Sequence, residues 1–189
     1  MKLMVLDRDG VINRESVAFI KTPGEWIPMP GSLEAIARLT QDGWRIAVAT
    51  NQSGLARGLF SMVALNAIHA RMHRAIAQAG GRIDAVFYCG DGPDGASRFR
   101  KPAPGMLTDI AERFNVSMQG VPAVGDSRRD LEAAVAAGAQ PVLVLTGNGE
   151  RVRAEGALPP GTRVFADLDR KSTRLNSSHV KRSRMPSSA

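Results

Sequence analysis

The chain has 189 residues, of which 43% are hydrophobic, and a formal net charge of +7. The hydrophobic share supports a packed core and excludes wholesale disorder, and the length is typical of one domain. No apolar run approaches the roughly 20 residues that span a bilayer. The N-terminus turns acidic too early for a secretory signal, and the one cysteine, Cys89, excludes an internal disulfide framework. We therefore expect a soluble, cytoplasmic domain with no membrane partner.

Short apolar runs alternate along the chain with segments of helical periodicity, and Gly and Pro separate them. Strands that alternate with helices form parallel βαβ units. We therefore predict an α/β fold, a three-layer doubly wound parallel sheet, with Ser32 as the N-cap of its first helix and 7–31 as a loop. The predicted strands are 2–6, 45–50, 84–88, 121–124, 141–145 and 163–165, and the predicted helices are 32–40, 61–79, 104–114 and 127–137.

The excess positive charge is concentrated at the C-terminus. Residues 169–189 hold six of the 25 Lys and Arg residues and one of the 18 Asp and Glu residues, so 1–168 carries only +2. The tail is rich in Ser and Arg, which is typical of disorder, and 169–179 reads as the translation of a common sequencing-adapter oligonucleotide. The alternative is a basic arm for nucleic acid. We expect a domain over 1–168 that lacks its last helix, a foreign tail, and no nucleic-acid partner.

Reactive side chains follow three of the predicted strands. Ligands of open parallel sheets bind outside the carboxyl ends of the strands, so these side chains are expected to converge. Clustered carboxylates repel one another and favour a hard divalent cation with oxygen ligands, typically Mg²⁺. The sequence therefore predicts a Mg²⁺ site beside a hydroxyl and an ammonium group. The residues are Asp7 and Asp9 after 2–6, Thr50 and Asn51 at the end of 45–50, Lys101 before Pro102, and Asp126 and Asp130 after 121–124.

Four strings resemble, in order, the four motifs of the haloacid dehalogenase-like (HAD) phosphatase superfamily. They are DRDGV at 7–11, TNQSG at 50–54, RKP at 100–102 and GDSRRD at 125–130. The resemblance implies a Rossmannoid fold and a phosphatase that works through an aspartyl phosphate. The chain has no long insertion between these strings, so we expect no large cap domain and a site shaped by short loops.

The resemblance also implies roles for individual residues. Asp7 would attack phosphorus, and Asp9 would protonate the leaving oxygen and later activate water. The Asp7 carboxylate, the Asp9 main-chain carbonyl and Asp126 would hold Mg²⁺, which screens the nucleophile from the phosphate.

The remaining motif residues would bind the phosphoryl group. By the same resemblance, Thr50 and the backbone N–H of Asn51 would bind phosphate oxygens, and Lys101 would neutralise their charge. Asp130 would orient Lys101. Positioning and charge neutralisation of this kind supply most of the catalysis in phosphoryl transfer.

Longer strings resemble the branch of small phosphatases that contains the histidinol phosphatases and the heptose-bisphosphate phosphatases. The run Ser-Gly-Leu-Ala-Arg-Gly at 53–58 is closer to the latter. This resemblance implies hydrolysis of the 7-phosphate of D-glycero-D-manno-heptose 1,7-bisphosphate in lipopolysaccharide-precursor synthesis. We expect the protein to be a monomer. Arg57 and Arg100 are candidates for binding the second phosphate. The alternatives are histidinol phosphate, another small phosphomonoester and, less favoured, a nucleic-acid end.

This branch usually has a loop with four Cys and His ligands for a structural zinc ion, and three of those four ligands are missing here. Cys89 remains, but Asp91, Ser97 and Phe99 stand where the branch has His, Cys and Cys. A closed structural zinc site needs four Cys or His ligands, so we predict no zinc. The pair His69 and His73, four residues apart on a predicted helix, is expected to lie on a solvated face.

Overall fold

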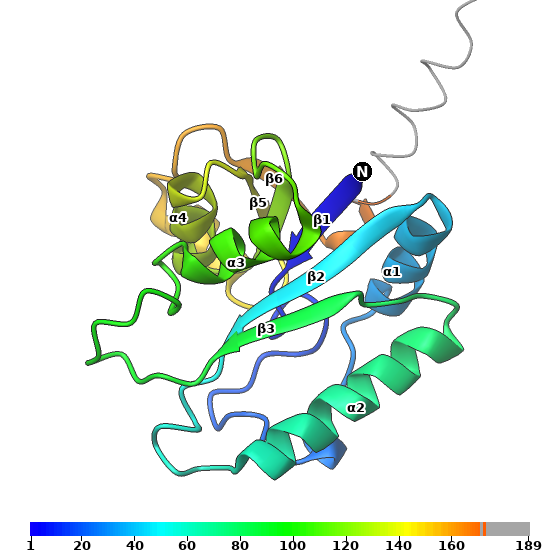
Figure 1. The fold of residues 1–189 in the computed structure, drawn as a ribbon, viewed down its shortest axis with the longest axis vertical. Coiled ribbons are helices and arrows are strands. Elements are labelled where there is room, and N and C mark those ends of the chain that lie inside the picture. The colour runs from blue at the N-terminus through cyan, green and yellow to red at the C-terminus, as the bar shows by residue number, and fades with distance from the viewer. Residues whose placement is uncertain (171, 173–189) are drawn as a thin grey trace, which may run out of the picture.

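The computed structural model describes residues 1–170 and 172. They form a six-stranded parallel sheet in the order β3-β2-β1-β4-β5-β6, with helices on both faces (Figure 1). The predicted α/β class and three-layer architecture are confirmed. The strands are β1 (Lys2–Leu6), β2 (Trp44–Asn51), β3 (Ala85–Cys89), β4 (Pro122–Gly125), β5 (Gln140–Val144) and β6 (Arg163–Phe165). The helices are α1 (Ser32–Gln41), α2 (Met62–Gln78), α3 (Gly105–Phe114), α4 (Arg128–Ala136) and α5 (Gly149–Glu155), and Pro23–Glu25 is a 3₁₀ turn.

The central strand shows why these apolar runs lack a polar face. Successive side chains of a strand point to opposite faces of the sheet, and both faces are covered here. Met4 and Leu6 of β1 pack in the core that holds α1 and α2, whereas Leu3 and Val5 pack in the core beneath α3. The strand order reverses next to β1, between β2 and β4, so the chain leaves the carboxyl ends of these strands in diverging directions. That point is where open α/β sheets bind ligands.

The sequence analysis missed one helix and assigned one helix cap wrongly. Helix α5 was not predicted, because its sequence GERVRAE is short and polar and buries only Gly149 and Val152. Ser32 does not cap α1: the N-cap is Gly31, and the Ser32 hydroxyl donates to the carbonyls of Ile12 at 2.7 Å and Met29 at 2.9 Å. Ser32 therefore holds the long loop after β1 against α1.

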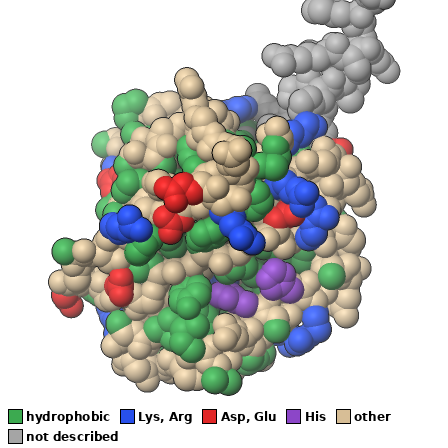
Figure 2. All heavy atoms as spheres, in the orientation of Figure 1, with side chains coloured by type: hydrophobic (Ala, Val, Ile, Leu, Met, Phe, Trp, Pro, Cys, Tyr) green, Lys and Arg blue, Asp and Glu red, His purple; other side chains and the backbone are tan. Residues whose placement is uncertain are grey.

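The described chain continues past the predicted domain end at residue 168. A helical turn includes Leu168, Asp169 and Arg170, and Asp169 is ion-paired with Arg38 of α1. Most of the predicted disordered tail, 169–189, lies outside the described residues. Within the described part, the connections between elements are loops without an inserted cap domain, and no helix is long and apolar enough to cross a membrane. Figure 2 shows acidic and basic side chains interspersed over the face it presents.

Candidate active site

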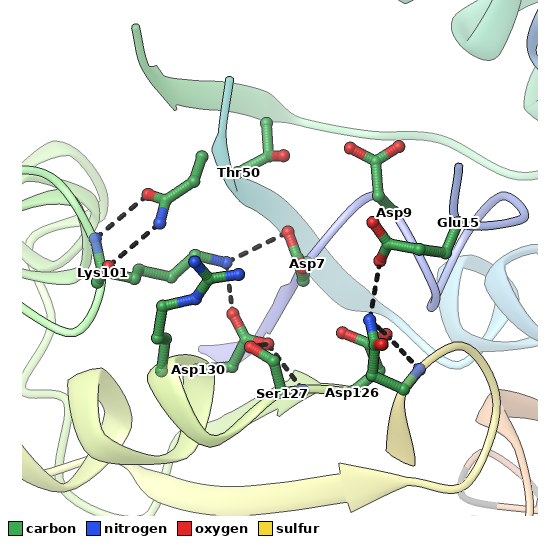
Figure 3. A pocket seen from close by; sticks show the side chains of 11 residues that line it. Asp7, Asp9, Glu15, Thr50, Lys101, Asp126, Ser127 and Asp130 are labelled. Atoms are coloured by element: carbon green, nitrogen blue, oxygen red, sulfur yellow. Dashed lines mark hydrogen bonds and ion pairs between the residues drawn. The ribbon is translucent and has the colours of Figure 1, made fainter. Parts of the chain in front are cut away.

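The carboxyl ends of β1 and β4 bring three aspartates together. Asp7 follows β1 directly, and its N–H donates to the Val124 carbonyl of β4 at 2.8 Å, which fixes the two strand ends side by side. One carboxylate oxygen from each of Asp7, Asp126 and Asp130 lies within 4.8 Å of the others. Figure 3 shows these side chains pointing into one pocket. The predicted convergence is therefore present, with Asp130 as a full member of the cluster.

Lys101 is the cation of this cluster. Its ammonium contacts Asp7 Oδ1 at 3.0 Å, Asp130 Oδ1 at 2.5 Å and the Ala49 carbonyl at 2.7 Å, and the residue is only 4% exposed. Burial alone would lower the pKa of Lys101, but the charges of Asp130 and Asp7 outweigh burial and raise it. The ammonium therefore stays charged and holds the Asp7 carboxylate in one orientation.

The start of α4 fixes the aspartate that holds Lys101. Asp130 Oδ2 accepts hydrogen bonds from the Ser127 N–H at 3.0 Å and the Ser127 hydroxyl at 2.6 Å, which forms a capping box at the helix N-terminus. Gly125 makes room for this packing, because a Cβ there would lie 2.1 Å from Asp130 Cβ. One oxygen of Asp130 therefore caps the helix while the other binds Lys101.

Asp126 is held in a similar way by Asn148, which lies in the segment after β5. Its Oδ2 accepts from the Asn148 N–H at 2.7 Å and the Asn148 side chain at 3.2 Å. Burial raises the pKa of Asp7 to about 8, despite the opposing charge of Lys101. Burial and the charge of Asp130 raise the pKa of Asp126 to about 7. Buried carboxylates that resist ionisation, with oxygen atoms as the only donors, fit a hard divalent cation such as Mg²⁺.

The backbones of Gly10 and Gly147 pack against the carboxylate of Asp126. A Cβ at Gly10, which has φ +80°, would lie 2.1 Å from Asp126 Oδ2. Gly43 has nearly the same φ, +78°, but open space around it. We expect Gly43→Ala to lower the free energy of unfolding by about 1–2 kcal/mol through backbone strain, with activity unchanged.

The corresponding substitution at Gly10, beside Asp126, should also affect catalysis. Gly10→Ala should have the same backbone cost and should also displace Asp126, so that kcat/KM falls about 10²-fold. Thermal unfolding and phosphatase kinetics measured on both variants separate strain from displacement. Equal activity of the two variants would show that close packing at Asp126 has no catalytic importance.

The raised pKa values also predict how a cation affects stability. A carboxyl whose folded pKa lies above its unfolded value takes up a proton on folding, so stability falls as the pH rises between the two values. For Asp7 that interval runs from 3.8 to about 8. We expect the melting temperature in EDTA to fall from pH 5.5 to pH 8. Mg²⁺ should raise it more at pH 8, since binding requires ionised ligands. Calorimetry checks this, and an equal Mg²⁺ shift at both pH values would contradict it.

The Asp9 side chain is held separately from this cluster. Its carboxylate accepts hydrogen bonds from Arg8 Nη2 at 2.9 Å, from Asn13 at 2.8 Å and from Gln52 at 2.9 Å. Asp9 still lines the pocket together with Asp7. Sequence reasoning missed Arg8, Asn13 and Gln52, although all three stand within or next to the motif strings.

The end of β2 supplies the other predicted phosphate contacts. Thr50 lines the pocket and is 1% exposed, and its hydroxyl accepts from Gln52 at 2.9 Å. The Asn51 amide side chain exchanges two hydrogen bonds with the Lys101 backbone, each 3.0 Å long. The side chain of Asn51 thus joins two motif strings, while phosphate binding by its N–H stays a prediction.

A hollow of about 310 Å³ adjoins the aspartate pocket and shares Asp9, Glu15, Asn51 and Arg129 with it. Its walls come mainly from short loops, as the sequence predicts, and these loops lie at 11–30, 52–60 and 89–100. Three arginines line it: the predicted Arg57 and Arg100, and Arg129 of α4, which was not predicted. Burial and the nearby charge of Arg129 lower the pKa of Arg100, so an anion bound between the arginines would relieve their repulsion. Asp9 and Glu15 line the same hollow.

Comparison with known proteins agrees with this geometry. A family model described as HAD-hydrolase-like matches 98–170, and one described as polynucleotide kinase 3 phosphatase matches 2–131. A D-glycero-beta-D-manno-heptose-1,7-bisphosphate 7-phosphatase of Bordetella bronchiseptica is 62% identical over 168 residues, 89% of this chain and 94% of the relative. The enzyme of that name from Pseudomonas putida is 55% identical over 89% of this chain and 95% of its own length.

Solved structures place the chain in the same group. A crystal structure of D,D-heptose 1,7-bisphosphate phosphatase from B. bronchiseptica, complexed with magnesium and phosphate, has a TM-score of 0.93 and 60% identity. It covers 94% of this chain and 99% of the other. The chain belongs to the heptose-bisphosphate phosphatase family of HAD hydrolases. The same enzyme from Burkholderia thailandensis has a TM-score of 0.75 and 52% identity, at 94% and 99% coverage. As a member of this family, the chain is a phosphoric monoester hydrolase.

The loop at 89–99, for which the sequence predicts no zinc, is held by contacts between its own side chains. The Cys89 thiol donates to Asp91 Oδ2 at 3.5 Å and lies 3.6 Å from the Ser97 hydroxyl. Ser97 in turn accepts from the Phe99 N–H at 3.3 Å. The four positions that would hold zinc are thus linked through a thiol, a carboxylate and a hydroxyl, and the absence of zinc stays a prediction.

The histidine prediction for this heptose-bisphosphate phosphatase chain was wrong for one residue. His73 is exposed, as expected, but His69 is 9% exposed and contacts Arg8 Nη1 at 3.3 Å. A helical spacing alone does not show which face of α2 packs against the long loop after β1, so the burial of His69 could not be read from the sequence.

Proposed function

We propose that this chain hydrolyses the 7-phosphate of D-glycero-D-manno-heptose 1,7-bisphosphate with Mg²⁺, through a phosphorylated Asp7, in cytoplasmic lipopolysaccharide-precursor synthesis. The observation that carries the proposal is the pairing of two pockets: one holds the cluster of Asp7, Asp126 and Asp130 with Lys101, and the other is lined by Arg57 and Arg100, with Arg129 lining both. The first has the groups that phosphoryl transfer needs, and the second offers a site for another phosphate. The names of the relatives support the choice of sugar.

Asp7 is the proposed nucleophile. Its Oδ1 accepts from the Arg8 N–H at 2.7 Å and from Lys101 at 3.0 Å, so the carboxylate is oriented before substrate binds. In the first step, an Asp7 oxygen forms a bond to phosphorus as the bond to the sugar oxygen breaks, and Asp9 gives that oxygen a proton. In the second step, Asp9 takes a proton from water, which attacks phosphorus and releases Asp7.

The charged groups around the phosphoryl group have separate tasks. Lys101 and the Thr50 hydroxyl bind its oxygens, and Asp130 keeps Lys101 in place. The carboxylates of Asp7 and Asp126, with the Asp9 main-chain carbonyl, would hold Mg²⁺. When bound, the ion neutralises charge on the nucleophile and on the transferring group.

The arginine-lined hollow supports the choice of a bisphosphate substrate. Hydrogen bonds to charged groups contribute about 1.5–3 kcal/mol each. We therefore expect Arg57→Ala to raise KM for the bisphosphate about 10–100-fold, while KM for the heptose 7-monophosphate changes little. Arg151→Ala is the control, because Arg151 lies on the surface of α5 and pairs with Glu155 at 2.7 Å. Steady-state kinetics on both esters check this, and an equal KM increase on both would place Arg57 outside the second phosphate site.

A nucleic-acid 3′-phosphatase is the second candidate, because a model of that family matches 2–131. A substrate panel with Mg²⁺ distinguishes the two, using the heptose bisphosphate, histidinol phosphate and a 3′-phosphorylated oligonucleotide. We expect kcat/KM to be at least about tenfold higher for the heptose bisphosphate, a difference of about 1.4 kcal/mol in transition-state binding. Faster release from either other ester would overturn the assignment of substrate.

A further inference from the structure

A buried contact joins helix α2 to the residue between the two catalytic aspartates. Arg8 is fully buried, and its Nη1 lies 3.3 Å from Nε2 of His69. The His69 ring packs beside Tyr88 of β3, with the ring centroids 6.4 Å apart. The imidazole of this α2 residue is therefore fixed between Arg8 and Tyr88, and only a small part of it reaches solvent.

The other nitrogens of Arg8 bind Asp9. Arg8 Nε and Nη2 donate to Asp9 Oδ1 at 3.1 Å and 3.0 Å, and Nη2 also donates to Asp9 Oδ2 at 2.9 Å. A guanidinium is planar, so binding one of its edges to a carboxylate fixes the direction of the remaining nitrogen. That nitrogen, Nη1, points to His69.

The chemistry of the contact assigns the roles of donor and acceptor. A guanidinium has no acceptor, so His69 Nε2 must accept and the ring proton must lie on Nδ1. Burial and the positive charge of Arg8 lower the pKa of His69 to about 4, so the ring is neutral near pH 7. A neutral ring can accept from Arg8 without like-charge repulsion.

We propose that His69 is a positioning residue for the hydrolysis, because its hydrogen bond to Arg8 fixes the guanidinium that orients the Asp9 carboxylate. The inference rests on the proposed function, in which Asp9 protonates the leaving oxygen. Gln52 and Asn13 also bind Asp9, but they leave Arg8 Nη1 without an acceptor. Without His69, the Nη1 group of the buried Arg8 would have no hydrogen-bond acceptor. The guanidinium would then rotate toward another acceptor and no longer hold Asp9 in the same orientation.

The test compares two esters that differ in their need for a general acid. kcat/KM covers the steps up to release of the leaving group. A sugar alkoxide needs a proton from Asp9, whereas 4-nitrophenolate leaves without one. A general acid contributes about 10²–10⁴-fold to the rate. His69→Leu should remove part of this contribution and lower kcat/KM for the heptose bisphosphate about 10–100-fold. For 4-nitrophenyl phosphate, the same variant should lower kcat/KM only about twofold.

Companion variants separate positioning from folding. His69→Gln restores an acceptor and should recover most of the loss, and His73→Leu, on the exposed face of the same helix, should match the wild type. Because His69 acts through Arg8, His69→Leu should add no further loss in an Arg8→Met background. Each protein is compared at equal folded concentration, which circular dichroism and thermal unfolding establish.

The outcomes are distinct. An equal loss on both esters, with His69→Gln no better than His69→Leu, would show a structural role and overturn the inference. Unchanged kinetics of His69→Leu would overturn it as well. In both cases the wild type stays active, so the proposed function survives, whereas a wild type that is inactive on both esters would overturn both.

Discussion

Replacing Asp7 by Asn should reduce phosphate release from the heptose bisphosphate at least about 10⁴-fold, as removal of a covalent nucleophile does in other hydrolases. The amide lacks the charged oxygen that bonds to phosphorus, and neither Asp126 nor Asp130 can take its place, because Asn148, Ser127 and Lys101 hold them. Steady-state kinetics with Mg²⁺ measure the loss.

The same substitution should make the metal-free protein more stable at pH 8. Burial raises the pKa of Asp7 to about 8, so ionising this side chain near that pH opposes folding, and a neutral amide avoids the cost. Thermal unfolding in EDTA measures the effect. Asp42→Asn, on the exposed turn after α1, is the control and should change neither property. An Asp7→Asn variant with near-normal turnover would end the aspartyl-phosphate mechanism.

Replacing Lys101 by Met should lower kcat about 10²–10³-fold, the usual result of removing one preorganised electrostatic donor. The ammonium contacts Asp7, Asp130 and the Ala49 carbonyl, so its loss leaves the nucleophile without its orienting cation. The two carboxylates would then lie buried and uncompensated, which costs about 3–5 kcal/mol when one partner of a buried pair is removed.

The stability loss of Lys101→Met should depend on pH. At pH 5.5, protonation of Asp7, whose pKa burial raises to about 8, relieves part of the unpaired charge, so the loss should be smaller than at pH 8. Denaturant unfolding at the two pH values measures it. The control is Lys21→Met, which removes a half-exposed ammonium with a partner at 3.8 Å and should change little. Wild-type turnover in Lys101→Met would contradict the role given to this residue.

The fold and the centre of the site could be predicted because their signals are local. Each predicted strand is a short apolar run, and alternation of these runs with helices indicates a parallel sheet. Asp7 and Asp126 follow such runs directly, and topology alone then brings them to one edge. Lys101 was found through its motif string, and its contacts with Asp7 and Asp130 agree with the task that the resemblance implied.

The remaining contacts depend on packing between elements that no local pattern encodes. Arg129 lines the hollow because α4 begins beside the loops, and Asn148 reaches Asp126 from the segment before α5. His69 is buried because α2 packs against the loop after β1. Helix α5 was missed because only Val152 on it gives an apolar side chain to the core. These residues support the site from other elements, so only the assembled structure shows them.

Phosphorus-31 NMR of the reaction with D-glycero-D-manno-heptose 1,7-bisphosphate and Mg²⁺ tests the central claim most directly, because it distinguishes the two phosphates of one substrate. The primary 7-phosphate signal should disappear as inorganic phosphate forms, while the anomeric 1-phosphate signal remains, and Asp7→Asn should leave both signals unchanged. Loss of the anomeric phosphate first, or no release from either position by the wild type, would contradict the assignment of these aspartates and arginines to a heptose-bisphosphate 7-phosphatase.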